Sequence, residues 1–464
     1  MKKQLIVSIS GLRGIYGEGL DLEVVIRFAA GFALLHNKLK NNLVIGRDGR
    51  STGRILSRAM ASLLQAMGWQ VIDVRLVTTP TIAMAVPYYQ AVGGIMITAS
   101  HNPPEWNGIK FLNGSGEFIS AEDWGLIEAW VGSEEDIPYT SYDKVGDYNR
   151  VKDALTHHIE AILALPYIHK DTIRARNFKI VVDGANSVGS IAIPALLEAL
   201  GVFPERIVKI HDSMSGNFER PGEPLEAHLE KLREVVVQED ANLGLAVDPD
   251  GDRLALVDNN GVYVNEELTQ VIAADFLWGF RSGPFVTNLS SSMAIDTVAQ
   301  KYGMKVYRSS VGELNVVQKM KAVGAILGGE GNGGVILPEV HYGRDSLVGT
   351  ALLLQHLANQ EISLAQLRGS LPQYVMIKEK MALGSADVGA ILARLAAKYA
   401  HENISTEDGL RVTREDSWVH IRASNTEPIL RIYGEAKSKV LAEDLVGSFK
   451  DFISRKGAKA QRGC

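Results

Sequence analysis

Short apolar segments, each ending in a polar and glycine-rich cluster, recur along this chain and constrain its fold more than any other feature. Such segments stand at residues 43–45, 94–97, 180–182, 243–247 and 325–327. Unbroken apolar runs of this length are typical of strands that are buried on both faces of a sheet. Helical patterns lie between them, as at 54–67 and 191–200. Because strands and helices alternate, we predict an α/β fold whose ligands bind where the strands end.

Three breaks divide the sequence. A polar stretch lies at 132–147, a run of turn-forming residues at 258–261, and a third break at 369–373. The 464 residues suggest about three domains, but a candidate binding loop follows the last break, so we predict four. The predicted domains are 1–150, 151–258, 259–370 and 371–464. The basic tail 455–464 is expected to be a disordered, solvated end.

The charge balance excludes some classes of partner. The chain has 48 basic and 54 acidic residues and a formal net charge of −6, whereas nucleic-acid-binding domains are usually strongly basic. No apolar segment reaches the roughly 18 residues that a membrane-spanning helix needs. The first residues predict a strand rather than a signal peptide. We therefore expect a cytoplasmic protein, a monomer or homodimer, that binds neither nucleic acid nor membrane.

The run Asp248-Pro249-Asp250-Gly251-Asp252-Arg253 follows one of the predicted strands. Three carboxylates at alternate positions of a turn bring together hard oxygen ligands, which suit Mg²⁺ or Ca²⁺. An EF-hand is excluded, because Asn259 stands where its bidentate glutamate is expected. The alternative is an aspartate-rich turn without a metal. Three close carboxylates repel one another unless a cation offsets their charge, so the run favours a metal site.

The run Thr98-Ala99-Ser100-His101-Asn102-Pro103 ends another predicted strand. A hydroxyl beside an imidazole offers a nucleophile and a base. The Gly-x-Ser-x-Gly turn of many hydrolases is absent from this run. An equally good interpretation is that Ser100 and Asn102 are turn residues before a proline. Lys110 follows closely and can meet an anionic group.

Two further loops carry groups that suit polar ligands. The loop 422–428 combines an arginine, two hydroxyls and an amide, as in a phosphate-binding turn, although such residues are also common in ordinary loops. The loop 328–334 holds Glu330 and Asn332 among glycines. It lacks the Gly-Lys-Ser/Thr of a nucleotide-binding loop. It suits the hydroxyl groups of a sugar, and the alternative is a flexible turn.

Taken together and in this order, these motifs resemble those of the α-D-phosphohexomutase superfamily, which includes phosphoglucomutase, phosphomannomutase and phosphoglucosamine mutase. The resemblance extends from Ser10-Gly11-Leu12-Arg13-Gly14 to the loop 422–428. It implies an α/β fold of three related mixed α/β domains and a smaller C-terminal α+β domain around a central active-site cleft.

The resemblance also implies roles for the matched residues. The run 98–103 matches the family's phosphoserine motif, which makes Ser100 the phosphorylated serine. The run 248–253 matches its metal loop, in which Mg²⁺ is held by three aspartates and a phosphate oxygen on the serine. The expected metal ligands are therefore Ser100, Asp248, Asp250 and Asp252. The expected catalytic residues are Ser100, His101, Lys110, Arg13 and Arg253.

The two other loops match the family's sugar-binding and phosphate-binding loops. The expected sugar-binding residues are Gly312, Glu330 and Asn332, and the expected phosphate-binding residues are Arg422, Ser424, Asn425 and Thr426. The sugar loop departs from many members, because Asn332-Gly333-Gly334 replaces Ser-Gly-His and leaves no histidine for acid–base chemistry. Its sequence is similar to that of archaeal-type phosphoglucosamine mutases and phosphomannomutases, and the opening residues resemble bacterial phosphoglucosamine mutases. These features favour an amino sugar.

The function that this resemblance implies is the interconversion of a hexose 6-phosphate and a hexose 1-phosphate through a phosphoserine and a bisphosphorylated sugar. Glucosamine phosphate is the expected substrate, and mannose and glucose phosphates are the alternatives. His101 and Lys110 are both candidates for moving the proton. A magnesium-dependent sugar phosphatase and a non-catalytic sugar-phosphate-binding protein remain as hypotheses of other classes.

Overall fold

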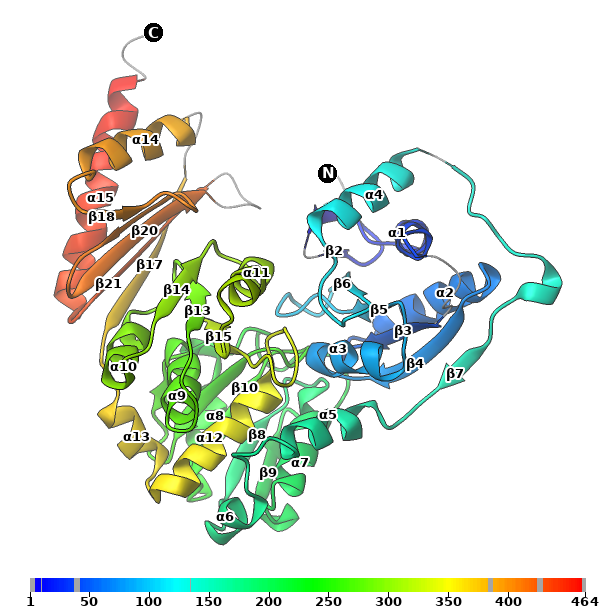
Figure 1. Ribbon diagram of the computed structural model, residues 1–464, viewed down its shortest axis with the longest axis horizontal. Helices are drawn as coiled ribbons and strands as arrows, with labels where there is room; N and C mark the ends of the chain where they lie inside the picture. Colours follow the sequence, from blue (N-terminus) through cyan, green and yellow to red (C-terminus); the bar gives the residue numbers. More distant parts are fainter. Residues whose placement is uncertain are drawn as a thin grey trace. The chain divides into compact units, whose positions relative to one another are not determined.

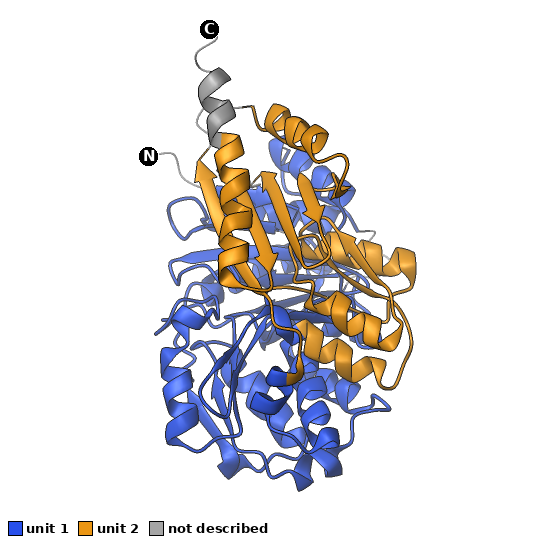
Figure 2. Ribbon diagram, turned by 90° about the vertical axis from the view of Figure 1, so that its left-hand side faces the viewer, with its two compact units in different colours: residues 1–269, 332–369 blue, residues 270–331, 370–464 orange. Residues whose placement is uncertain are grey.

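The structure is a computed structural model that describes residues 5–9, 11–36, 42–133, 135–382, 387–423 and 429–460, with side chains described as far as residue 453. Helices and strands alternate along most of the chain (Figure 1). The chain divides into two compact units (Figure 2). Unit 1 contains residues 1–269 and 332–369, and unit 2 contains residues 270–331 and 370–464.

The first sheet of unit 1 has seven strands in the order β1-β2-β6-β5-β3-β4-β7. In the chain they are β1 (Leu5–Ser8), β2 (Gly11–Ile15), β3 (Asn42–Arg47), β4 (Gln70–Leu76), β5 (Gly93–Ile97), β6 (Trp106–Asn113) and β7 (Tyr148–Arg150). Strand β3 runs parallel to β4 and β5, whereas β6 is antiparallel to β5 and β2. The strands predicted at 43–45 and 94–97 are confirmed.

Helices cover both faces of this sheet. Three of them are α1 (Leu22–Leu34), α2 (Gly53–Ala66) and α4 (Ala121–Gly132), which share one core, and α3 (Thr79–Tyr88) packs in a second core. Alternate side chains of a strand point to opposite faces, so Ile95 and Ile97 of β5 enter the first core and Met96 enters the second. The unbroken apolar run of β5 is therefore buried on both sides, as predicted.

The second sheet of unit 1 has the order β12-β11-β10-β8-β9. Its strands are β8 (Ile180–Asp183), β9 (Ile207–Ile210), β10 (Leu243–Val247), β11 (Leu254–Asp258) and β12 (Tyr263–Val264). Strand β8 is parallel to β9 and β10, and β11 is antiparallel to β10 and β12. Helix α8 packs against this sheet through Leu232 and Val236. The remaining elements of the unit are α5 (Ala154–Leu163), α6 (Lys170–Ala175), α7 (Gly189–Ala199), α8 (Glu230–Gln238), β16 (Gly334–Ile336), α12 (Ser346–Gln360) and most of α13 (Leu364–Ser370).

Unit 2 contains two sheets. In the first, β14 (Val306–Ser309), β13 (Phe285–Asn288) and β15 (Leu327–Glu330) are parallel neighbours. Its helices are α10 (Ala294–Tyr302), α11 (Glu313–Val323) and most of α9 (Glu267–Trp278). The apolar run 325–327 marks only the start of β15, which continues through two glycines. A Cβ on Gly328 would lie 2.4 Å from the sulfur of Met320 and 2.9 Å from the carbonyl oxygen of Val286, so the packing around β15 favours glycine at this position.

The last sheet is antiparallel throughout, in the order β17-β21-β20-β19-β18. Its elements are β17 (Val375–Ala382), α14 (Val388–Lys398), β18 (Asn403–Ser405), β19 (Leu410–Thr413), β20 (Ser417–Ala423), β21 (Ile429–Ala436) and α15 (Lys439–Ala460). Leu395 of α14 and Phe449 of α15 share its core. Three sheets that alternate with helices and a C-terminal α+β layer agree with the predicted fold class. The boundaries near 150, 258 and 370 stay predictions. The expectation of a disordered end is wrong for residues 455–460, which continue α15, and residues 461–464 lie outside the described residues.

Among the described residues, no helix has both the length and the apolar character that crossing a bilayer requires.

Candidate active site

Two of the polar loops of unit 1 are turns that join antiparallel strands. The loop with Ser100 connects β5 to β6, whose residues Ile97 and Ile109 pair, and the aspartate loop connects β10 to β11. The Ser100 hydroxyl donates a hydrogen bond to Oδ2 of Asp248 at 3.1 Å. Two motifs that lie 148 residues apart therefore meet in one buried site, with Ser100 only 1% exposed.

Arg50 fixes the backbone of the Ser100 loop. Its guanidinium donates to four carbonyl oxygens at 2.5 to 3.0 Å, those of Ser100, Asn102, Pro103 and Trp106. Its Nε lies 3.1 Å from Oδ2 of Asp48, which also accepts the hydroxyl of Thr98. Ser100 is thereby held at a φ of +50°, a conformation that residues other than glycine rarely adopt. A role for Arg50 was not predicted from the sequence, although Arg50 lies in the polar cluster that follows the apolar run 43–45.

The two sheets of unit 1 approach closely beside these loops. The amide of Gly49 donates to the hydroxyl of Ser187 at 2.8 Å, and that hydroxyl donates to the carbonyl of Pro249 at 2.5 Å. A Cβ on Gly49 would lie 2.8 Å from Ser187, and a Cβ on Gly222 would lie 2.7 Å from the carbonyl of His101. These contacts form a closely packed interface between the two sheets, here called the seam, beside the serine and aspartate loops. The seam has no space for larger side chains at Gly49 and Gly222.

The carboxylates of Asp248, Asp250 and Asp252 converge as the sequence predicts. One oxygen of each lies within 4.8 Å of the others, and all three residues are at most 1% exposed. Oδ1 of Asp250 and Oδ1 of Asp252 have no hydrogen-bond partner among the residues that the structure describes. Buried carboxylate oxygens without donors are costly unless a cation binds them, and oxygen donors of this kind suit Mg²⁺. The residues present therefore fit a magnesium ion.

The environment of each carboxylate changes its proton affinity. Burial raises the pKa of Asp248 well above its ordinary value, and the charges of Asp252 and Asp250 raise it further. Burial acts in the same direction on Asp250, but the ammonium group of Lys110 and hydrogen bonds with Asp248, Lys110 and Thr79 together outweigh it and hold the pKa of Asp250 below its ordinary range. The Nζ of Lys110 lies 2.7 Å from Oδ2 of Asp250 and 3.7 Å from Oδ2 of Asp252.

Three arginines add positive charge. Arg253 donates to Glu223 at 2.8 Å, and its Nε lies 3.9 Å from Asp248. Arg13 donates to the side chain of Asn102 at 3.3 Å. Arg344 donates to Oδ2 of Asp252 at 2.7 Å. The sequence alone does not predict a role for Arg344, because it lies 92 positions from Asp252 and only the fold brings the two residues together.

His101 is the ring closest in sequence to the candidate nucleophile. Its Nδ1 lies 3.3 Å from Oγ of Ser100. Burial lowers the pKa of His101 to about 2, and the positive charges of Arg253 and Arg13 add to the effect. The imidazole is therefore uncharged at neutral pH before any phosphate is present. A phosphate dianion on Ser100 opposes the effect of the arginines.

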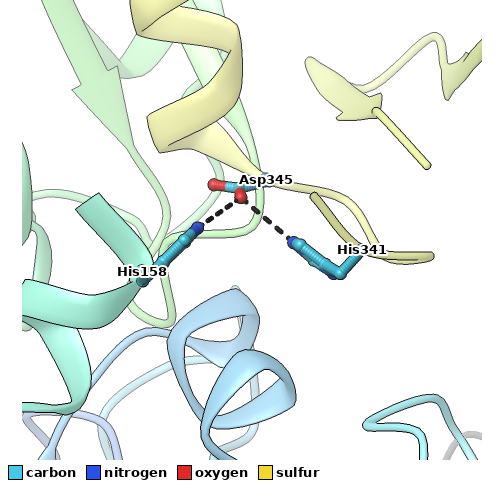
Figure 3. Close-up of side chains that lie close together, drawn as sticks. All are labelled: His158, His341 and Asp345. Atoms are coloured by element: carbon cyan, nitrogen blue, oxygen red, sulfur yellow. Dashed lines mark hydrogen bonds and ion pairs between the residues drawn. The ribbon is translucent and has the colours of Figure 1, made fainter. Parts of the chain in front are cut away.

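A second group of potential metal ligands, His158, His341 and Asp345, lies next to a residue that contacts the aspartate loop. Nε2 of His158 and Nε2 of His341 lie 2.8 and 3.0 Å from the same oxygen of Asp345 (Figure 3). The other oxygen of Asp345 accepts the amides of Leu347 and Val348 and so caps α12. These hydrogen bonds satisfy the carboxylate without a metal. The next residue, Ser346, donates to the carbonyl of Gly251 at 2.7 Å, so the capped helix supports the aspartate loop.

The candidate sugar-binding residues of unit 2 lie together at the end of β15. Oε1 of Glu330 accepts hydrogen bonds from the side chain of Asn288 at 3.0 Å and from the amide of Gly312 at 3.3 Å. The first residue of the second segment of unit 1 is Asn332, whose side chain accepts the amide of Gly334 at 3.2 Å. The structure therefore brings Glu330 and Gly312 into contact, which spacing alone does not predict.

Arg422 is the last residue but one of β20 in unit 2. It is 8% exposed, and its Nε has no hydrogen-bond partner among the described residues. Burial lowers the pKa of Arg422. A buried guanidinium with a free N–H group suits an anion. The other predicted phosphate-binding residues, Ser424, Asn425 and Thr426, lie outside the described residues.

Comparison with known proteins gives consistent matches. Four models described as phosphoglucomutase/phosphomannomutase match in order: alpha/beta/alpha domain I at residues 5–137, domain II at 156–261, domain III at 266–374 and the C-terminal domain at 376–451. The chain is 35% identical over 441 residues to "Phosphoglucomutase/phosphomannomutase" of Thermococcus kodakarensis, which covers 94% of this chain and 95% of that protein.

Two further proteins extend the comparison. The chain is 33% identical over 450 residues to "Probable phosphoglucosamine mutase" of Methanopyrus kandleri, with 96% and 97% of the two chains covered. Among solved structures, a phosphoglucomutase/phosphomannomutase family protein from Burkholderia thailandensis superposes with a TM-score of 0.80 at 25% identity and covers 99% of each chain.

Proposed function

The chain belongs to the phosphoglucomutase/phosphomannomutase family, and on that basis we propose that it interconverts glucosamine 6-phosphate and glucosamine 1-phosphate. Family membership makes it a phosphohexomutase, an isomerase that transfers a phosphoryl group. The observation that supports the proposed mechanism is the contact between Oγ of Ser100 and Oδ2 of Asp248. It joins a hydroxyl that can carry a phosphoryl group to a cluster of carboxylates that fits a cation.

In the proposed reaction, Ser100 carries a phosphoryl group that it gives to a free hydroxyl of the sugar phosphate. The bond between phosphorus and Oγ breaks while a bond to the sugar oxygen forms, which gives a bisphosphorylated sugar. The intermediate turns over, and Ser100 then takes back the phosphoryl group from the other position. Phosphoryl transfer depends mainly on positioning and charge neutralisation. We assign positioning of Ser100 to Arg50 and neutralisation to Arg13, Lys110 and Arg253.

The proposed magnesium ligands are Asp248, Asp250, Asp252 and a phosphate oxygen on Ser100. When bound, Mg²⁺ supplies positive charge to the phosphoryl group during transfer. Lys110 and Arg344 each bind one of these aspartates and orient its carboxylate. Oδ1 of Asp250 and Oδ1 of Asp252 accept no hydrogen bond from the described part of the chain, which favours a cation as their partner.

Each transfer also moves a proton from the attacking sugar hydroxyl. His101 is proposed to exchange this proton at Oγ of Ser100, because its Nδ1 lies 3.3 Å away. Lys110 is the second candidate, since its ammonium group is buried beside the same site. Glu330, Asn332 and Gly312 are the proposed sugar-binding residues. Arg422, with Ser424, Asn425 and Thr426, is proposed to hold the phosphate that does not react.

The amino sugar is the finer part of the proposal. Several relatives at 31 to 33% identity carry the name phosphoglucosamine mutase, whereas the relative at 35% carries the name phosphoglucomutase/phosphomannomutase. The test is to measure kcat/KM for the 6-phosphates of glucosamine, mannose and glucose in one buffer, with Mg²⁺ and a bisphosphorylated sugar present. We expect a preference for glucosamine of at least about tenfold. A preference for another hexose contradicts the proposed glucosamine substrate but not the proposed mutase activity.

The phosphoserine has a separate test. Intact mass and peptide mapping of the wild type are expected to find one phosphoryl group on Ser100, and Ser100→Ala is expected to lose it together with mutase activity. The exposed Ser115 provides a matched control, because Ser115→Ala removes a hydroxyl outside the site and keeps full activity. Full mutase activity in Ser100→Ala contradicts the mechanism. Net release of inorganic phosphate by the wild type identifies a phosphatase instead.

A further inference from the structure

A second concentration of positive charge lies on the first sheet, apart from the proposed catalytic residues. The guanidinium groups of Arg47, Arg54, Arg58, Arg75 and Arg150 line a pocket of about 250 Å³. The one carboxylate among its lining residues is that of Asp73. Five positive groups against one negative group leave an excess of four charges. This excess is unusual in a chain whose formal net charge is −6.

Asp73 is already occupied by other donors. It accepts the hydroxyl of Tyr148, and its other oxygen accepts the amide of Arg75 at 2.8 Å. Nε of Arg150 lies 3.6 Å away. The side chains of Arg54 and Arg58 make no hydrogen bond or ion pair with any described residue. Most of the positive charge of the pocket is therefore left without a partner in the described chain.

The strand geometry directs one of these arginines. Ile45 of β3 pairs with Asp73 of β4, and the next residue, Gly46, pairs with Arg75, so β4 bulges at Val74. Arg75 adopts a φ of +69°, which a residue with a Cβ adopts only at a cost. Bulges commonly redirect a side chain and often lie next to functional sites. Here the bulge places Arg75 in the lining of the pocket.

The start of α2 adds to the unbalanced charge. Arg54 and Arg58 stand in its first two turns, its first turn holds no acidic residue, and the N-cap Thr52 makes no side-chain capping bond. Cations are disfavoured at the positive end of a helix, and a bound anion relieves that repulsion. Burial lowers the pKa of Arg47, and the charges of Arg54 and Arg75 add to this effect although Asp48 and Asp73 oppose it.

We propose that this pocket binds the pyrophosphate group of a small ligand. A phosphate monoester carries about 1.5 to 2 negative charges at neutral pH, and two phosphates joined through one oxygen carry about three, which offsets most of the excess of four. Guanidinium groups bind phosphate oxygens with paired hydrogen bonds. The volume of 250 Å³ accommodates a diphosphate rather than a whole nucleotide. None of the residues that line the pocket is one of the proposed catalytic, metal-binding, sugar-binding or phosphate-binding residues.

The proposal does not depend on the proposed function and is tested by calorimetric titration of the full chain in Mg²⁺-free buffer. The probes are inorganic pyrophosphate, ADP and sulfate. We expect pyrophosphate to bind, and the double variant Arg54→Gln/Arg58→Gln to raise its Kd about tenfold or more. The variant Arg394→Gln/Lys305→Gln changes the net charge equally on side chains that form no ion pair with the described residues, and we expect it to keep the wild-type Kd. Raising the salt concentration weakens binding in the wild type.

Pyrophosphate can also bind at the Ser100 site, so Arg253→Gln is titrated in parallel. We expect this variant to retain the binding that Arg54→Gln/Arg58→Gln loses. The opposite result overturns the proposal. Equal affinity for sulfate and pyrophosphate also overturns it and identifies an adventitious anion site only. If ADP binds at least as tightly as pyrophosphate, the ligand of the pocket is a nucleotide. If pyrophosphate binds and ADP does not, the ligand is free pyrophosphate.

Discussion

Arg50 is a buried cation whose side chain donates all of its hydrogen bonds to the Ser100 loop and to Asp48. A guanidinium group has five N–H groups, and those of Arg50 meet four carbonyl oxygens of the Ser100 loop and Oδ2 of Asp48. A compact ammonium group has three donors on a flexible stem and cannot reach all of these acceptors. The position of Ser100 therefore depends on the shape of the guanidinium as well as on its charge.

We predict that Arg50→Lys lowers kcat about 100-fold, since a small displacement of a reacting group costs this much. The KM should change little, because Arg50 is not among the proposed substrate contacts. The matched control is Arg27→Lys, which alters a guanidinium that donates to the carbonyls of Val131 and Glu135 far from Ser100 in the sequence. A folded Arg50→Lys protein with kcat within twofold of wild type contradicts this positioning role.

At the scale of elements, α12 connects the histidine pair to the aspartate loop. Asp345 caps the helix and accepts both His158 and His341. Burial acts to raise the pKa of Asp345, but its interactions with His158 and His341 outweigh burial and hold it below the ordinary range. A lowered pKa stabilises the fold above the pKa of the unfolded chain, about 3.9, and this contribution disappears as the pH falls below that value.

We predict that Asp345→Asn lowers the free energy of unfolding at pH 7 by roughly 1 to 3 kcal/mol, because asparagine has one acceptor oxygen and cannot both cap α12 and accept the two imidazole groups. Urea denaturation between pH 7 and pH 3 should show this difference shrinking below about pH 4. Asp387→Asn is the matched control, since Asp387 caps α14 through the amide of Ala390 and asparagine is an equally good cap. A difference for Asp345→Asn that does not vary with pH rules out the ionic contribution.

At the scale of the whole molecule, all three candidate metal ligands from the aspartate loop belong to unit 1. A cation that binds the folded chain alone adds to its stability in proportion to the logarithm of its concentration. Mg²⁺ at 100 times its Kd should raise the free energy of unfolding by about 2.7 kcal/mol. This stabilisation can be measured without any substrate.

We predict that Asp250→Asn removes most of the increase in Tm that Mg²⁺ produces in the wild type. The carboxylate contributes a charged oxygen that the amide lacks. The control is Asp444→Asn on the exposed face of α15, which should retain the full Mg²⁺ effect. Differential scanning calorimetry with and without Mg²⁺ gives the comparison. An unchanged Mg²⁺ shift in Asp250→Asn shows that the ion binds elsewhere.

The sequence predicts those features that are carried by local pattern. The apolar runs at 94–97 and 243–247 appear as β5 and β10, and the aspartates at 248–252 converge as expected. Features that depend on distant partners were missed. Arg50 reaches carbonyls about 50 positions away and Arg344 reaches Asp252 across 92 positions, and neither spacing leaves a local signature. The roles of the candidate residues rest on family resemblance, because chemistry at a site is not encoded in periodicity.

The seam between the two sheets of unit 1 has a mechanical consequence. Gly49 and Gly222 leave no space for a Cβ, and Ser187 bridges the amide of Gly49 and the carbonyl of Pro249. A hinge needs a joint that can open without breaking packed contacts, and this seam offers none. We therefore expect the serine loop and the aspartate loop to move together as one rigid body. The distance between Oγ of Ser100 and the carboxylate of Asp248 should then stay the same when a substrate binds.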